Sequence, residues 1–182
     1  MAYQQFNADN AFQLQMRPAA VRIYQTLFPD CQVSHLEGRE GQAHVLDAEF
    51  AIDAMIRMTQ GQCLSVQEKF RRHSFMRRWD FTQEYRNAVG TEYEAPGEWY
   101  KLWAQLYFYG WANAELNDFG AWFLMDIVKY KLLVEEAGGL AKLGVYHRNQ
   151  RHGSADFYAI PVAALAPAIL ESRGVPQRFL AR

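Results

Sequence analysis

Between Leu46 and Arg72, two alternating segments flank a polar turn at Thr59–Gln62 that contains a glycine. The first segment runs from Ala48 to Met58 and the second from Cys63 to Arg71. A period of two residues is typical of strands, so the stretch predicts a β-hairpin. In the first expected strand, the residues that share one face are Glu49, Ala51, Asp53 and Met55. In the second, they are Ser65, Gln67, Lys69 and Arg71.

The hairpin concentrates groups that could hold a divalent cation. If Asp53 faces the same side as Gln67 and Lys69, a carboxylate, an amide and an ammonium group meet at one place. Mg²⁺ prefers oxygen ligands and is usually held by one or two carboxylates together with water. Asp53, Gln67 and the main-chain carbonyl of Glu68 are the candidate metal ligands, with Mg²⁺ or Mn²⁺ as the expected cofactor. Lys69 could orient or deprotonate a water, or stabilise charge on a phosphate.

An aspartate followed by Gln-x-Lys across a hairpin resembles the core of the PD-(D/E)xK nuclease superfamily, in its variant with a Gln-x-Lys third motif. Here the motif is Asp53, a gap of 13 residues, and Gln67-Glu68-Lys69. The resemblance implies a restriction-endonuclease-like α/β fold, with a mixed central sheet flanked by helices and a helix–strand–strand–strand–helix–strand core. It also implies that Asp53, Gln67 and Lys69 are catalytic.

The order of elements predicted along the chain agrees with that core over roughly residues 7–133. The expected helices are Asn7–Phe28, with a break or kink at Pro18, then Glu98–Asn113 and Pro161–Ser172. The expected strands outside the hairpin are Cys31–Leu36, Phe81–Arg86, Phe119–Leu133 and Asp156–Ile160.

Two further positions bear on the resemblance. Gln105 and Tyr109 lie four residues apart in the expected 98–113 helix, and this QxxxY spacing resembles a motif of RecB-like exonucleases. An aromatic-rich helix also produces such a pair through ordinary core packing. Many relatives carry a glutamate on the first helix, but residues 7–28 contain none, so Glu40 or Glu49 would have to substitute.

A basic segment follows the hairpin and contains Arg71, Arg72, Arg77 and Arg78, interleaved with aromatic residues. Arginines beside a metal site supply affinity for the phosphate backbone that does not depend on sequence. A solvated loop or strand end is the alternative interpretation. Because the formal charge of the chain is −1, binding of nucleic acid would have to depend on such a local patch.

Length and composition predict one domain spanning residues 1–182, with 50% hydrophobic residues. The two cysteines show no CxxC spacing, and the chain contains no apolar run long enough for a membrane span. The first ten residues have neither a basic region nor an apolar stretch, so we expect no signal peptide. We therefore expect a cytoplasmic protein without membrane association. Rossmann, P-loop and nucleophile-elbow motifs are absent from the sequence.

The sequence leaves two candidate functions open. The first is a metal-dependent nuclease that hydrolyses DNA phosphodiester bonds. The second is a non-catalytic member of the same fold that binds nucleic acid or a protein partner. The Asp53, Gln67 and Lys69 set favours the nuclease, whereas the missing first-helix glutamate favours the binding protein. The expected partner is nucleic acid, in particular DNA, and homo-oligomerisation is left open.

Overall fold

The predicted hairpin is present as two antiparallel neighbours, β2 (Ala54–Arg57) and β3 (Cys63–Arg71). The computed structural model describes residues 2–36, 41–149 and 154–180. Ala54 lies opposite Val66 and Arg57 opposite Cys63. In the turn, the Met58 amide donates to the Gln62 carbonyl, and Gly61 has a φ of 85°, a conformation that glycine adopts without strain.

The prediction that a strand begins at Ala48 is wrong. Residues 48–50 complete a helix, α2 (Gln42–Phe50), and β2 begins only at Ala54. Ala51 ends the helix in the left-handed conformation, and its amide donates to the Leu46 carbonyl. Leu46 packs against the hydrophobic core, and this tertiary contact favours the helix over a longer strand.

Six strands form one mixed sheet, in the order β1–β2–β3–β6–β7–β10. Only the β3–β6 pair is parallel, so the chain is an α/β protein with a mixed sheet flanked by helices. The strands not yet defined are β1 (Gln32–His35), β6 (Leu106–Ala112), β7 (Phe119–Asp126) and β10 (Ile169–Arg173). β1 confirms the strand expected near residues 31–36.

A second sheet has the order β5–β4–β9–β8 and is antiparallel throughout. Its strands are β4 (Asp80–Asn87), β5 (Ala95–Pro96), β8 (Val145–His147) and β9 (Asp156–Pro161). β4 and β9 contain the strands expected at 81–86 and 156–160. The short helices are α3 (Glu98–Lys101), α5 (Leu140–Leu143), α6 (Val162–Leu165) and the 3₁₀ helices η1 (His73–Arg78) and η2 (Gln177–Phe179).

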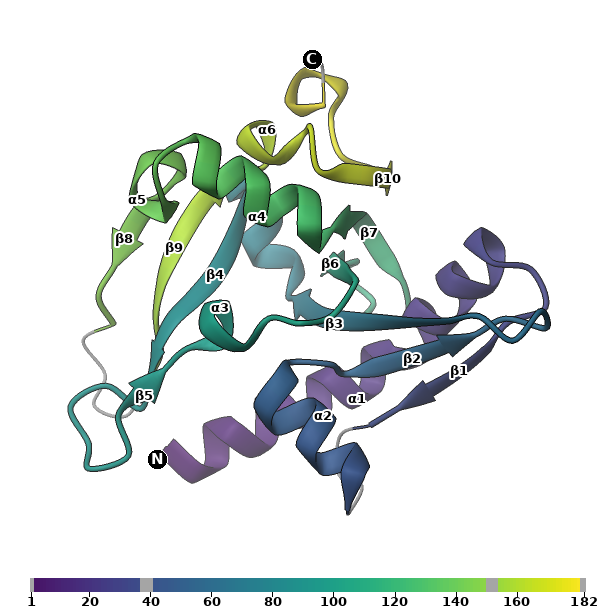
Figure 1. Ribbon diagram of the computed structural model, residues 1–182, viewed down its shortest axis with the longest axis horizontal. Helices are drawn as coiled ribbons and strands as arrows, with labels where there is room; N and C mark the ends of the chain where they lie inside the picture. The colour runs from purple at the N-terminus through teal and green to yellow at the C-terminus, as the bar shows by residue number, and fades with distance from the viewer. Residues whose placement is uncertain (1, 37–40, 150–153, 181–182) are drawn as a thin grey trace.

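The two faces of the six-stranded sheet bury separate cores. The long helix α1 (Ala2–Leu27) packs on one face through Phe12, Met16 and Tyr24, as Figure 1 shows behind β2 and β3. The opposite face packs against the second sheet and α4 (Ile127–Glu136). Successive side chains along β3 therefore point into different cores. Only side chains on the same face of β3 can contact one another.

The prediction of one helix over Glu98–Asn113 is also wrong. The helix α3 ends at Lys101, and residues 106–112 form β6, in which every residue is buried. A central strand covered on both faces gives a continuous apolar run, which has no period of two to distinguish it from a buried helix. The aromatic residues of this run favour a strand, and pairing with both β3 and β7 completes the sheet.

Three further boundaries differ from the sequence expectation. The stretch 119–133 divides into β7 and α4, because the Asp126 carboxylate caps α4 by accepting from the Lys129 amide. The stretch 161–172 contains only the short α6 and then enters β10. The first helix begins at Ala2 and continues through Pro18, which is exposed, instead of breaking there. Among the described residues, no helix is both long and apolar enough to cross a bilayer.

Candidate active site

Asp53 lies directly beside the middle of β3. Its amide donates to the Val66 carbonyl (2.9 Å), and its Oδ2 accepts from the Glu68 amide (2.7 Å). Asp53 precedes β2, in which Ala54 packs in the core with α1 and Met55 in the opposite core. Gln67 and Lys69 share one face of β3, since both contact Glu98. The structure therefore brings Gln67 and Lys69 together, and it places the Asp53 carboxylate at the main-chain amide of Glu68, the residue between them in the sequence.

Desolvation dominates the electrostatics of Asp53. Burial raises the pKa of Asp53 well above its usual range, and the negative charge of Glu68 raises it further. The hydrogen bond from the Glu68 amide acts in the opposite direction. Burial therefore disfavours the ionised form of Asp53, and a nearby positive charge would stabilise that form.

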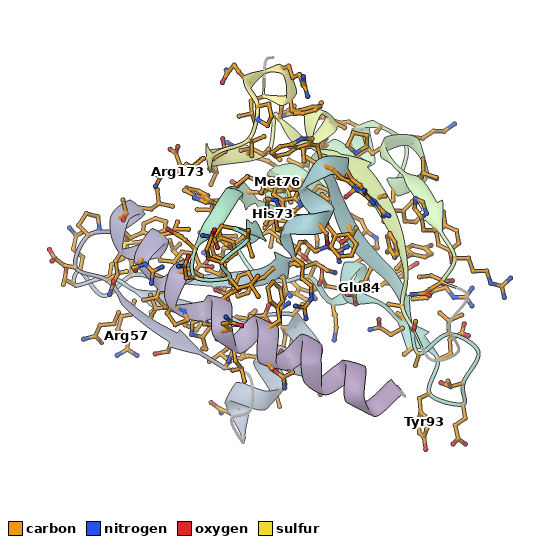
Figure 2. All side chains as sticks on the ribbon, turned by 180° about the vertical axis from the view of Figure 1, so that it is seen from behind. Arg57, His73, Met76, Glu84, Tyr93 and Arg173 are labelled. Atoms are coloured by element: carbon orange, nitrogen blue, oxygen red, sulfur yellow. The ribbon has the colours of Figure 1, made fainter. Side chains whose placement is uncertain are left out.

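Lys69 is held as an ammonium group between two carboxylates. Its Nζ lies 2.8 Å from Oε1 of Glu84 on β4 and 3.9 Å from Oε2 of Glu98 on α3. Burial opposes the charge on Lys69, but the two carboxylates prevail and raise the pKa of Lys69. The same ammonium group lowers the pKa of Glu84. Glu84 appears on the β4 side in Figure 2, and Arg57 marks the outer end of the hairpin.

Gln67 contacts Glu98, the buried glutamate that also lies near Lys69. Its Nε2 lies 3.4 Å from Glu98 Oε2 and 3.4 Å from the Glu68 main-chain oxygen. Its Oε1 is buried and has no hydrogen-bond partner among the residues that the structure describes. Buried carbonyl oxygens in proteins usually pair with a protein group or a water, so this oxygen is free to accept from one.

Glu98 is the functional candidate that the sequence interpretation missed. It is 7% exposed, and its Oε1 accepts from Gln83 Nε2 and Tyr107 Oη, both at 2.8 Å. Burial raises the pKa of Glu98, although Lys69 partly offsets this effect. Gly97 allows this placement, because a Cβ there would lie 2.7 Å from the main-chain carbon of Tyr85 on β4. In the sequence, Glu98 is an isolated acid between Gly97 and an aromatic-rich run, and this is the signal that could have identified it.

The Glu68 side chain points to the opposite face of β3. Its Oε1 accepts from the Tyr24 hydroxyl of α1 (2.7 Å), and its Oε2 lies 3.2 Å from Nε2 of His35 on β1. Only the main chain of Glu68 therefore faces Asp53 and Gln67. The carboxylate fastens α1 and β1 to the strand that carries the candidate site.

Gln105 and Tyr109 do not share a helix, contrary to the prediction. Gln105 immediately precedes β6, where its Oε1 accepts from the Ser65 amide (3.0 Å) and so fastens the start of the parallel β3–β6 pair. Tyr109 is fully buried, stacks on Phe123 and lies 3.3 Å from the Thr82 hydroxyl. These contacts give both residues a structural role in joining the strands.

The proposed substitutes for the missing first-helix glutamate do not join the cluster. Glu49 was expected on the Asp53 strand, but it lies exposed near the end of α2. Glu40 lies outside the described residues. Gln67 instead contacts the carboxylate of Glu98.

The basic segment continues from β3 into η1. The Arg71 guanidinium lies over the Phe75 ring (4.4 Å) and that of Arg72 over the Phe12 ring (4.5 Å). Arg77 and Arg78 are exposed on η1. A hollow of about 390 Å³ next to these arginines is lined by His73, Ser74, Met76, Arg77 and Trp79, of which His73 and Met76 are labelled in Figure 2.

The site contains oxygen atoms of the chemical type that Mg²⁺ and Mn²⁺ prefer. The Asp53 carboxylate, the orphaned Gln67 Oε1 and the Glu68 main-chain oxygen are hard ligands of the type that these cations prefer. Within residues 2–36, 41–149 and 154–180, no group of three or more His, Cys, Asp or Glu side chains is arranged to hold a metal. A cation here would therefore depend on amide, main-chain and water oxygens as well as carboxylates.

Comparisons of the chain with protein-family models, with curated proteins and with solved structures found no match.

Proposed function

We propose that this chain is a metal-dependent nuclease of the PD-(D/E)xK type, which hydrolyses DNA phosphodiester bonds. The observation that carries the proposal is that Gln67 and Lys69 share one face of β3, while the Asp53 carboxylate accepts from the amide of Glu68 between them. The orphaned oxygen of Gln67 adds to it, because that oxygen lacks the partner that a cation would provide.

A restriction-endonuclease-like core is consistent with the arrangement of α1, the β1–β2–β3 strands and a β6 strand parallel to β3. The chain departs from the expected order between β3 and β6. In place of one long helix, the connection contains η1, β4, β5 and the four-residue helix α3. This connection delivers Glu84 and Glu98 to Lys69, so the departure adds acidic side chains to the site.

In this proposal, different residues bind the cation and stabilise charge on the phosphate. Asp53 and the Glu68 main-chain oxygen bind the cation, and a bound Mg²⁺ or Mn²⁺ supplies Lewis acidity and an activated water. Lys69 acts as an ammonium group that stabilises negative charge on the phosphate, because its two carboxylate neighbours hold its proton. A lysine with a raised pKa is a poor general base at neutral pH, so the proton of the attacking water would pass to solvent water.

The test is turnover of single- and double-stranded DNA by the purified protein with Mg²⁺ or Mn²⁺. Asp53→Asn should abolish cleavage, because it removes the carboxylate that accepts from the Glu68 amide. Lys69→Ala should reduce cleavage strongly and leave cation binding in place. Asp30→Asn is the matched control, since Asp30 is exposed in a turn that asparagine also tolerates. Equal cleavage by wild type and Asp53→Asn would show that the site is misassigned.

One observation favours the alternative of a non-catalytic nucleic-acid- or protein-binding chain. Lys69 already has two carboxylate partners, so in this interpretation the cluster is a structural ion pair that joins β3 to β4 and α3. A wild-type protein that binds DNA but cleaves no substrate with either metal would establish this alternative over the nuclease.

DNA binding itself is tested by salt dependence. If the exposed Arg77 and Arg78 contact phosphates, affinity should fall steeply with salt, and replacing both with alanine should reduce the logarithmic salt slope by about two. Arg173, exposed on β10, provides a control of the same type. A slope unchanged by the Arg77 and Arg78 replacements would support the solvated-loop interpretation of η1.

A further inference from the structure

We propose that Glu98 is the second carboxylate of the cation site. We also propose that the side-chain amide of Gln67 flips when the cation binds, so that Oε1 and Nε2 exchange places. In the ligand set that we infer, Glu98 Oε2 and the Glu68 main-chain oxygen join Asp53, with Gln67 Oε1 turned toward them. This inference rests on the proposed metal-dependent function and extends it to a residue outside the Asp and Gln-x-Lys motif.

The first observation is the position of the Gln67 amide nitrogen. It lies 3.4 Å from two acceptor oxygens, Glu98 Oε2 and the Glu68 main-chain oxygen, which come from different elements. Both distances are long for hydrogen bonds, so the nitrogen holds neither acceptor tightly. A cation is favoured at a position between a carboxylate oxygen and a carbonyl oxygen. The amide NH₂ group that lies there supplies only a partial positive charge.

The second observation is the other end of the same amide. Gln67 Oε1 is buried without a partner among the described residues, so this orientation leaves one strong acceptor unsatisfied. Without a cation, the reverse orientation would point Oε1 at two other oxygens, and Glu98 therefore keeps the NH₂ group on its side. A cation between the oxygens reverses this preference, because Oε1 then becomes a ligand.

The third observation is how Glu98 is held. Its Oε1 is anchored by Gln83 and Tyr107, and this leaves Oε2 on the side of Gln67 and Lys69. Glu84 and Glu98 bring two carboxylates to the ammonium group of Lys69, so a divalent cation beside Glu98 Oε2 would balance the remaining negative charge.

The experiment measures Mn²⁺ and Mg²⁺ binding by calorimetry and the shift of the thermal midpoint with each metal, without any substrate. Glu98→Gln should weaken binding by about tenfold or more, since a charged ligand is lost. Glu115→Gln is the matched control, because Glu115 is exposed in the turn between β6 and β7, and its binding should equal that of wild type. Equal binding by Glu98→Gln and Glu115→Gln would overturn the inference.

Gln67→Glu provides a second test that does not depend on the folding of Glu98→Gln. It supplies an oxygen without any turning of the side chain, but it also places a second carboxylate against Glu98. The metal-free variant should therefore melt below wild type at neutral pH, and Mn²⁺ should raise its midpoint by more than that of wild type. If Gln67→Glu binds Mn²⁺ no more tightly than wild type, the inference is wrong.

The outcomes also separate this inference from the proposed function. If wild type binds neither metal, both fail together. If wild type binds metal, Asp53→Asn loses it and Glu98→Gln retains it, the proposed function survives and the role of Glu98 is refuted.

Discussion

Replacing Lys69 with methionine should destabilise the fold strongly at neutral pH and much less in acid. The change keeps most of the apolar stem of the side chain but removes the ammonium group from between Glu84 and Glu98. Breaking a fully buried pair by removing one partner costs about 3–5 kcal/mol. Glu84 is 32% exposed and can recover part of its hydration, and Glu98 keeps its bonds from Gln83 and Tyr107. We therefore expect a loss of about 2–4 kcal/mol at pH 7.

The pH dependence follows from Glu84. Lys69 holds the pKa of Glu84 below its usual range, so this pair contributes stability above the unfolded-state pKa of about 4.3. That contribution is lost as the pH falls through the lower pKa of folded Glu84. The pKa of Glu98 is raised by burial, and without Lys69 it should rise further, so acid protonates Glu98 in the variant and relieves the unpaired charge. The gap between wild type and Lys69→Met should therefore close below about pH 4.

The assay is urea unfolding at pH 7 and at pH 3.5, supported by thermal melts. For a chain of this size, a loss of about 3 kcal/mol corresponds to a midpoint lowered by roughly 6–12 °C. Lys129→Met is the control, because Lys129 is exposed on α4, and its unfolding free energy should stay near that of wild type. A Lys69→Met loss that is no larger than the control, or that is equal at both pH values, would refute the reasoning.

Three further substitutions test packing around the cluster by the same unfolding measurement. Tyr24→Phe removes a donor from the buried carboxylate of Glu68 and should cost about 1–3 kcal/mol, whereas the exposed Tyr93→Phe should cost little. Gly97→Ala places a Cβ 2.7 Å from the β4 main chain and should cost about 1–3 kcal/mol; an unchanged stability would mean that α3 is free to move. Pro18→Ala should stabilise the protein by about 1–3 kcal/mol, because an exposed proline inside α1 gives way to the best helix former.

The hairpin and its facing side chains could be predicted from the sequence because strand alternation is a local property. Gln67 and Lys69 share a face for the same reason, and the turn is marked by Gly61. The beginning of β2 was not predictable in this way. Residues 48–50 follow a pattern that suits either a strand or a helix, and the packing of Leu46 against the core favours the helix.

Glu98 and Glu84 could not be assigned from sequence, because they reach Lys69 only through tertiary structure. Glu98 was expected to begin a long helix, and the strand β6 within that stretch carries no alternation that would reveal it. The boundary between β7 and α4 was more accessible. Asp126 followed by Lys129 and an amphipathic run is an N-cap pattern, and a search for caps would have ended the strand there.

The parallel pairing of β3 with β6 has a kinetic consequence. Lys69 lies opposite Tyr109, forty positions along the chain, so the strands meet only after the long connection between them has closed. The β2–β3 hairpin needs only the closure of residues 58–62, and hairpins can form within microseconds. We therefore expect Gln67 and Lys69 to be aligned early during folding, and Glu84 and Glu98 to reach Lys69 later. Until then the ammonium group would remain in water.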